Sequence, residues 1–96
     1  MENLKSMVLE LIPDKRAEAI QSKELQALTG LPLRKLKEVI TELRKEHPIC
    51  SKETDGGGYW MAENENDIRE FIIMIAKRRN GYTQTINRMQ RHLDDM

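Results

Sequence analysis

Apolar residues recur at helical spacing in several stretches of the chain, and these stretches predict most of its structure. The first stripe predicts a short helix that Pro13 ends, because the residue before a proline is disfavoured in helical geometry. Residues 14–18 are polar and predict a connection, and residues 19–21 predict a short strand. The apolar positions of the first stripe are Leu4, Met7, Val8, Leu11 and Ile12.

Two further stripes flank Gly30 and predict a helix-turn-helix. The helix before Gly30 has Leu25 and Leu28 on its apolar side, and Ser22 is its expected N-cap because a serine hydroxyl can accept a free backbone N–H. Gly30 suits the left-handed conformation that ends many helices. Two helices joined by a tight glycine turn form a helix-turn-helix, whose second helix can enter a DNA major groove.

The segment 31–46 is the centre of this pattern. Leu31 is expected to fill the space between the two helices, and Pro32 opens the second helix, where its missing N–H costs nothing. The opposite face of the same helix carries mostly charged side chains. The buried side is predicted to be Leu36, Val39, Ile40 and Leu43.

After residue 46 the spacing of apolar residues changes from one typical of helices to one typical of β-strands. Residues 48–52 and 59–62 are β-prone, and residues 55–58 (Asp-Gly-Gly-Gly) are expected to form a flexible tip between them. We therefore predict a β-hairpin with a glycine-rich turn. Trp60 is expected to pack against the helix that follows, with stacking on a base as the alternative.

The last stripe predicts one helix over about 66–93, capped by Asn64 or Asn66. Asn80-Gly81 leaves a turn open as the alternative, although an interior glycine costs only about 1 kcal/mol against alanine. The fold class is thus mainly α with a small β-hairpin, divided into a domain over 1–62 and a helical extension over 63–96. The extension is predicted to be a dimerisation element through Ile75, Tyr82, Ile86, Met89 and Leu93, three of which fall at heptad intervals.

Charge is segregated along this neutral chain of 96 residues. Residues 15–52 hold nine basic and five acidic residues, a balance of +4; residues 53–70 hold six acids and one arginine, a balance of −5. Residues 77–91 hold five basic residues and no acid. The cluster Lys77-Arg78-Arg79 is therefore either solvated helix surface or a contact for phosphates.

Five short stretches carry a family resemblance: residues 22–25, 28–31, 39–44, 48–49 and 58–60 (Ser-Lys-Glu-Leu, Leu-Thr-Gly-Leu, Val-Ile-Thr-Glu-Leu-Arg, Pro-Ile and Gly-Tyr-Trp). Through them, residues 4–62 resemble the winged helix-turn-helix of biotin-repressor-type bacterial regulators. The resemblance implies that a helix at about 32–46 lies in the major groove of double-stranded DNA. It also implies that a wing at about 48–62 touches the sugar-phosphate backbone.

Candidate contacts follow from this reading. Arg34 and Lys37 can donate to guanine edges, and Glu38 and Thr41 lie on the same helix face, so these four are the candidates for base contacts. The candidates for the DNA backbone come from the rest of the helix, from the helix before it and from the wing. They are Ser22, Lys35, Arg44, Lys45, Lys52, Thr54, Gly56 and Gly57. The expected protein is a small transcriptional regulator or mobile-element protein that binds DNA sequence-specifically as a homodimer.

Other classes of function fit less well. A winged helix that binds proteins, as an assembly or replication accessory module, stays open because the net charge is zero. We expect no enzyme and no cofactor, since the glycine run lacks the lysine and hydroxyl of a phosphate loop. His47 and Cys50 have only the distant His92 to complete a metal site, so none is expected. One cysteine, no signal pattern and no membrane-spanning stretch favour the cytoplasm, and no small-molecule ligand is evident.

Overall fold

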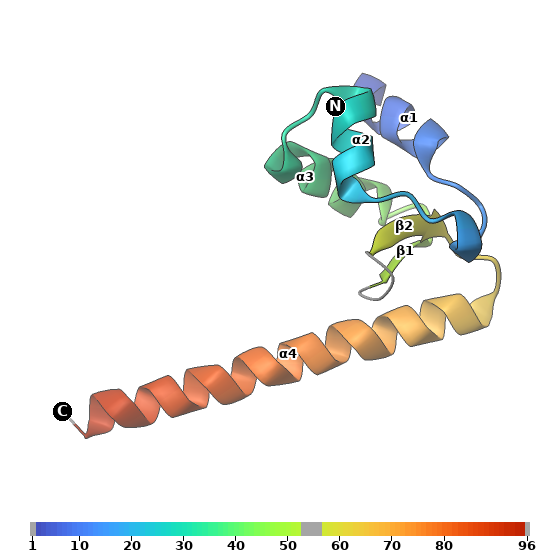
Figure 1. The fold of residues 1–96 in the computed structure, drawn as a ribbon. Coiled ribbons are helices and arrows are strands. Elements are labelled where there is room, and N and C mark those ends of the chain that lie inside the picture. Colours follow the sequence, from blue (N-terminus) through green and yellow to red (C-terminus); the bar gives the residue numbers. More distant parts are fainter. Residues whose placement is uncertain (1, 53–56, 96) are drawn as a thin grey trace.

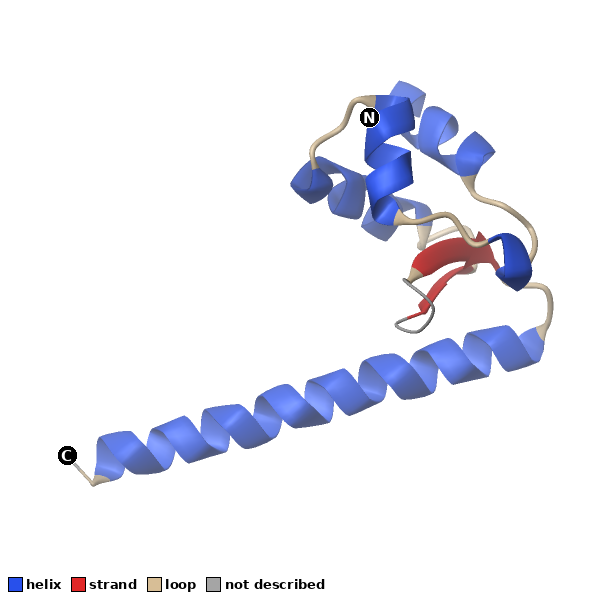
Figure 2. Cartoon of the chain, in the orientation of Figure 1, coloured by secondary structure: helices blue, strands red, loops and turns tan. Residues whose placement is uncertain are grey.

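The computed structural model describes residues 2–52 and 57–95, and it is mainly helical with one small antiparallel hairpin (Figures 1 and 2). This confirms the predicted fold class in its coarse form. Three short helices and a short 3-10 turn precede the hairpin, and one long helix follows it. In order, the elements are α1 (Glu2–Leu11), the 3-10 turn η1 (Arg16–Glu18), α2 (Ser22–Thr29), α3 (Leu33–Leu43), β1 (Ile49–Lys52), β2 (Gly58–Met61) and α4 (Glu65–Asp94).

The core lies where α1, α2 and α3 meet the hairpin, and it is built from the stripes read in the sequence. Leu25 of α2 and Leu36 of α3 are fully buried, and α3 contributes more buried residues than any other described helix. Leu31 is partly buried against this core, between α2 and α3 as expected. The buried cluster is Val8, Ile12, Ile20, Leu25, Leu36, Val39, Ile40, Leu43 and Ile49.

The turn between α2 and α3 uses glycine as predicted. Gly30 has φ 75°, and its N–H donates to Gln26 O at 2.8 Å, which closes the last turn of α2. The prediction of Ser22 as N-cap was wrong: Gln21 occupies that position without a side-chain bond, and Ser22 is the first helical residue. The helix starts one residue early because its first intrahelical bond runs from Leu25 N–H to Gln21 O.

The helix α3 is shorter than the predicted 32–46. Pro32 is its N-cap, with extended backbone, and the helix proper ends at Leu43. The next three residues form turns, with Glu46 N–H donating to Leu43 O at 3.1 Å. These turns direct the chain toward β1, which starts three residues after Glu46.

The hairpin pairs Cys50 with Trp60 and Lys52 with Gly58 in antiparallel register. The strand predicted at 19–21 is reduced to one bridge, in which Ile20 exchanges two backbone hydrogen bonds with Tyr59 at 2.8 and 2.9 Å. Gly58 has φ 130°, and a Cβ built on it would lie 2.9 Å from the Cβ of Ala19. Glycine is therefore required where β2 meets this bridge.

The helix α4 is continuous over thirty residues, about 45 Å at 1.5 Å per residue. Asn64 caps it by accepting the N–H of Asp67, and Gly81 stays helical, with no described heavy atom beyond its chain neighbours and the local helix backbone within 4 Å of its Cβ position. Only its first half lies along the rest of the molecule, and the second half projects away from it (Figure 1). The radius of gyration, 16.3 Å, exceeds the roughly 13 Å of a compact domain of this length. Among the described residues, no helix combines the length and apolar character needed to cross a membrane.

Candidate nucleic-acid interface

The outward face of α3 carries all four residues predicted to contact bases. Arg34, Lys37, Glu38 and Thr41 are exposed and share one side of the helix, since they are spaced by three or four residues. The other side holds the four buried residues of α3. Packing therefore fixes the rotation of the helix, and the polar face points away from the core.

The charges on this face are only partly neutralised. Lys35 lies 3.6 Å from Glu38, and Lys45 lies 3.1 Å from Glu42. Within residues 2–52 and 57–95, neither Arg34 nor Lys37 has an ion-pair partner. Exposed pairs three residues apart are weak and are easily exchanged for other partners. The two cations best placed for a ligand are thus Arg34 and Lys37.

Arg44, a predicted backbone contact, is engaged within the fold. Its Nε donates to Ile49 O at 2.9 Å, and its guanidinium carbon lies 4.6 Å from the ring centroid of Phe71 in α4. A weaker bond of 3.5 Å reaches Ser51 Oγ. Burial lowers the pKa of Arg44, but the side chain stays charged because arginine titrates far above neutral pH. Arg44 therefore joins α3, β1 and α4.

A polar hollow adjoins the predicted recognition face. Lys37 and Thr41 line it from α3, Ser51 and Tyr59 from the hairpin, and Arg78 from α4. The Thr41 hydroxyl donates to Lys37 O at 2.9 Å, which leaves its oxygen lone pairs for other donors. The long helix thus places part of its basic segment beside α3, a relationship that the sequence reading did not predict.

The predicted backbone contacts outside α3 lie at several places. Lys52 is half-buried at the end of β1, and Gly57, with φ 80°, precedes β2. Ser22 is half-buried at the start of α2. Thr54 and Gly56 fall outside the described residues. Lys52 and Gly57 therefore lie on the hairpin, where a wing contact was expected.

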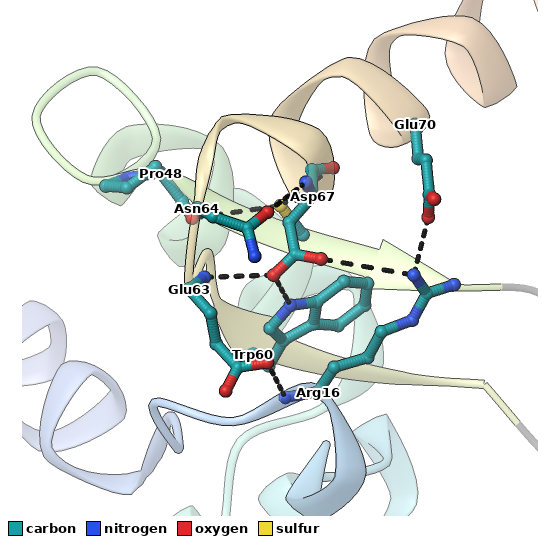
Figure 3. Close-up of polar contacts among 8 residues, drawn as sticks. Arg16, Pro48, Trp60, Glu63, Asn64, Asp67 and Glu70 are labelled. Carbon is teal, nitrogen blue, oxygen red and sulfur yellow. Dashed lines mark hydrogen bonds and ion pairs between the residues drawn. The ribbon is translucent and has the colours of Figure 1, made fainter.

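A buried carboxylate joins α4 to the hairpin (Figure 3). Asp67 is only 7% exposed, and its Oδ2 accepts the Trp60 indole N–H at 3.0 Å and the Glu63 backbone N–H at 2.9 Å. Arg16 lies over the Trp60 ring, 5.2 Å from its centroid, and pairs with Glu70. Trp60 is 2% exposed and packs against α4 as predicted.

Three ionisable groups where α4 meets the hairpin have shifted pKa values. The backbone N–H of Glu63, then the indole of Trp60, lower the pKa of Asp67 against the opposing effect of burial. The hydrogen bond to Glu70 raises the pKa of Arg16. Burial raises the pKa of the Cys50 thiol, whose Sγ lies 3.7 Å from Asp67 O. Sequence reasoning assigned Asp67 only to the helix dipole; its position after Asn64 was the signal for a cap, but its contact with Trp60 is tertiary.

The residues predicted for a dimer interface lie exposed along α4. Ile75 is 41% exposed, and the other four are between 59% and 69% exposed. Ile72 is 60% exposed on the same side of the helix. These positions form an apolar row that the described residues of the same chain leave in contact with solvent.

No group of three or more His, Cys, Asp or Glu residues suited to hold a metal ion occurs in the described parts of the chain.

Comparisons with known proteins give no information on the family or the activity of this chain. Searches with protein-family models, against curated proteins and against solved structures found no match to this chain.

Proposed function

We propose that the chain is a winged helix-turn-helix protein that binds double-stranded DNA sequence-specifically, as a small transcriptional regulator or mobile-element protein. The observation that carries this proposal is the exposed face of α3, where Arg34 and Lys37 form no ion pair with any described residue and Thr41 lies beside them. Arginine and lysine donate to the O6 and N7 acceptors of guanine, which makes them the usual readers of base edges in the major groove.

The dimensions of this face suit the groove. An α-helix with its side chains is about 10 to 12 Å in diameter, and a B-DNA major groove is about 12 Å wide. The preceding helix, α2, is held at a fixed angle by the Gly30 turn and by the shared core. A rigid pair of helices is what a base-reading helix needs, because a small rotation would move its side chains off the base edges.

Phosphate contacts would come from α3 and from the two elements beside it, the hairpin and α4. Lys52 and the backbone N–H of Gly57 serve from the hairpin, and Lys35 and Lys45 serve from the ends of the helix. The basic segment of α4 adds to them, since Arg78 lines the hollow beside Lys37. Arg44 is less suited to this task because its guanidinium already binds Ile49 O and stacks on Phe71.

The protein acts as a homodimer in this proposal, and α4 supplies the contact. Burial of an isoleucine, methionine or leucine side chain contributes roughly 1.5 to 3 kcal/mol, and α4 exposes several of them. We place the activity in the cytoplasm, which suits a chain with one cysteine and hence no internal disulfide. No catalytic step and no cofactor form part of the proposal.

A second candidate is a winged helix that binds a protein. Glu38 favours it, because its exposed carboxylate sits among the predicted base contacts and would face the negative potential of DNA. The same α3 face would then meet a partner with its own charges of both signs.

Selection of bound sequences from a random duplex library tests the two candidates. Sequence-specific binding predicts enrichment of a defined motif, and the affinity of the selected duplex should fall steeply as salt is raised, because bound counterions are released. Recovery of no motif, with weak binding that all duplexes share, would contradict DNA reading and leave the protein-binding candidate.

A further inference from the structure

The exposed apolar row of α4 has the spacing of a coiled-coil seam over nearly four heptads. Alternate steps of four and three residues connect two interleaved sets of positions. The first set is Ile72, Arg79, Ile86 and Leu93. The second set is Ile68, Ile75, Tyr82 and Met89, and every apolar member of both sets is at least 37% exposed.

Two open apolar hollows lie along this row. One apolar hollow is bounded in part by Ile72, Ile75, Ala76 and Arg79. The next is bounded in part by Arg79, Tyr82, Thr83 and Ile86. Both sets of four follow the spacing i, i+3, i+4, i+7, which is the outline of the hole that receives one knob of a partner helix in a coiled coil.

Arg79 favours an antiparallel direction for a second copy. A parallel pair in register would place Arg79 against the partner's Arg79 in the middle of the seam, and two guanidinium groups in an apolar layer repel each other. An antiparallel pair matches each position of the first set with one of the second set. Arg79 can then lie against the partner's Tyr82, whose ring face attracts a cation.

One antiparallel register uses the whole row. In it, Arg79 faces Tyr82, Ile75 faces Ile86, Ile72 faces Met89, and Ile68 faces Leu93, so the numbers in each pair add to 161. A shift by one heptad in either direction leaves two residues of the row without a partner. The flanking positions also agree, since Arg69 would lie near Gln90 and Arg78 near Thr85, with no two like charges opposed.

We propose that two copies of α4 pair as an antiparallel coiled coil in this register, with Arg79 of each chain against the partner's Tyr82. This inference rests on the homodimer proposed above and specifies its geometry. The two-fold axis passes between Asn80 and Gly81. Both of these residues lie on the outer side of the pair, where a glycine leaves no gap in the interface.

In this antiparallel pair, the two domains that carry α3 lie on the same side of the paired helices. That domain packs on α4 through Asp67, Phe71 and Met74, about a quarter-turn from the middle of the seam, and the seam residues Ile68 and Ile75 also line hollows that the domain bounds. An axis perpendicular to the plane of the two helices keeps the two domains on the same face of that plane. The partner residue level with Phe71 is residue 90, so the two copies of Phe71 lie about 28 Å apart along the helix axis.

Thiol crosslinking of the full-length chain without DNA tests the direction and register. Ile72→Cys and Met89→Cys variants are mixed in equal amounts and treated with a crosslinker that spans about 10 Å, and intact-mass spectrometry separates the three possible products. The antiparallel register predicts the 72–89 product alone, because like positions lie seventeen residues, or about 25 Å, apart along the axis. The unmodified chain, whose Cys50 is buried, is the control and should give no product.

Two results overturn the inference. Products linking 72 to 72 and 89 to 89 mean a parallel pair, which leaves the proposed homodimer standing with another geometry. No product at all overturns the register, and sedimentation of the same sample then shows whether the homodimer fails with it. Neither result touches DNA reading by α3, which the duplex selection tests separately.

Discussion

The indole N–H of Trp60 donates to the carboxylate of Asp67 at 3.0 Å, and this bond connects the hairpin to the first turn of the long helix. The same Asp67 oxygen accepts the backbone N–H of Glu63, so one buried charge holds both ends of the link between β2 and α4. The direction in which α4 leaves the domain is therefore set by a polar joint as well as by apolar contact. Removal of that charge should loosen the joint.

We expect Asp67→Asn to destabilise the fold by about 1.5 to 3 kcal/mol, the range for hydrogen bonds to a charged group. The pKa of Asp67 is lowered in the folded state, so its contribution is present above the unfolded pKa and is lost as the pH falls through the folded pKa. The difference between parent and variant in urea unfolding should thus be full at pH 7 and shrink in acid, below about pH 4. Glu65→Gln, at an exposed position in the same turn, is the matched control. A difference that stays constant into strong acid would contradict this role.

Gly58 is expected to tolerate no side chain. Gly58→Ala places a Cβ 2.9 Å from that of Ala19 at a φ of 130°, so the bridge between Ile20 and Tyr59 must shift. We expect a loss of about 1 to 3 kcal/mol in the free energy of unfolding, as for other strained backbone positions. Thermal unfolding checks this, and an unchanged midpoint would mean that residues 19–21 do not pack against the hairpin.

Gly81→Ala should act in the opposite direction. Gly81 is helical and has open space around its Cβ position, so alanine removes backbone entropy from the unfolded chain and clashes with nothing. We expect a gain of about 0.5 to 1 kcal/mol in helix stability. Circular dichroism at 222 nm during heating measures it, and a decrease in helix content would indicate that the chain needs a bend at this point.

The hairpin is expected to contact the DNA backbone. Lys52→Ala should weaken binding about equally for all duplexes, and should reduce the slope of log affinity against log salt by about one unit, as for the loss of one phosphate contact. Titrations of the selected duplex at several salt concentrations give the slope. A slope equal to that of the parent would remove Lys52 from the interface.

The helices follow from the local pattern of residues along the chain, whereas the contacts that hold the elements together do not. The stripe of Leu36, Ile40 and Leu43 and the glycine at position 30 predicted the helices, because helical spacing and left-handed backbone are local properties. The continuity of α4 through Gly81 was also predicted, since one glycine costs little in a long helix.

The contacts of Arg44 and Asp67 could not be predicted in the same way. Arg44 was expected to meet phosphates because it is a cation near a basic helix face, but it stacks on Phe71, which lies 27 positions later in the chain. Asp67 binds Trp60 only because the hairpin brings that indole to the start of α4. The cap at Ser22 was misplaced by one residue, since serine suits the cap and the first turn alike.

DNA reading by the exposed face of α3 is the central claim, and its most direct test is the affinity of an Arg34→Ala, Lys37→Ala double variant for the selected duplex. Each lost base contact should weaken binding by about 1 to 3 kcal/mol, or roughly 5- to 150-fold, while binding to an unrelated duplex changes much less. Lys15→Ala, at an exposed position outside the proposed interface, should bind as the parent does. If the double variant kept the affinity of the parent for the selected duplex while remaining folded, α3 would not contact the bases, which would contradict sequence-specific binding by this helix.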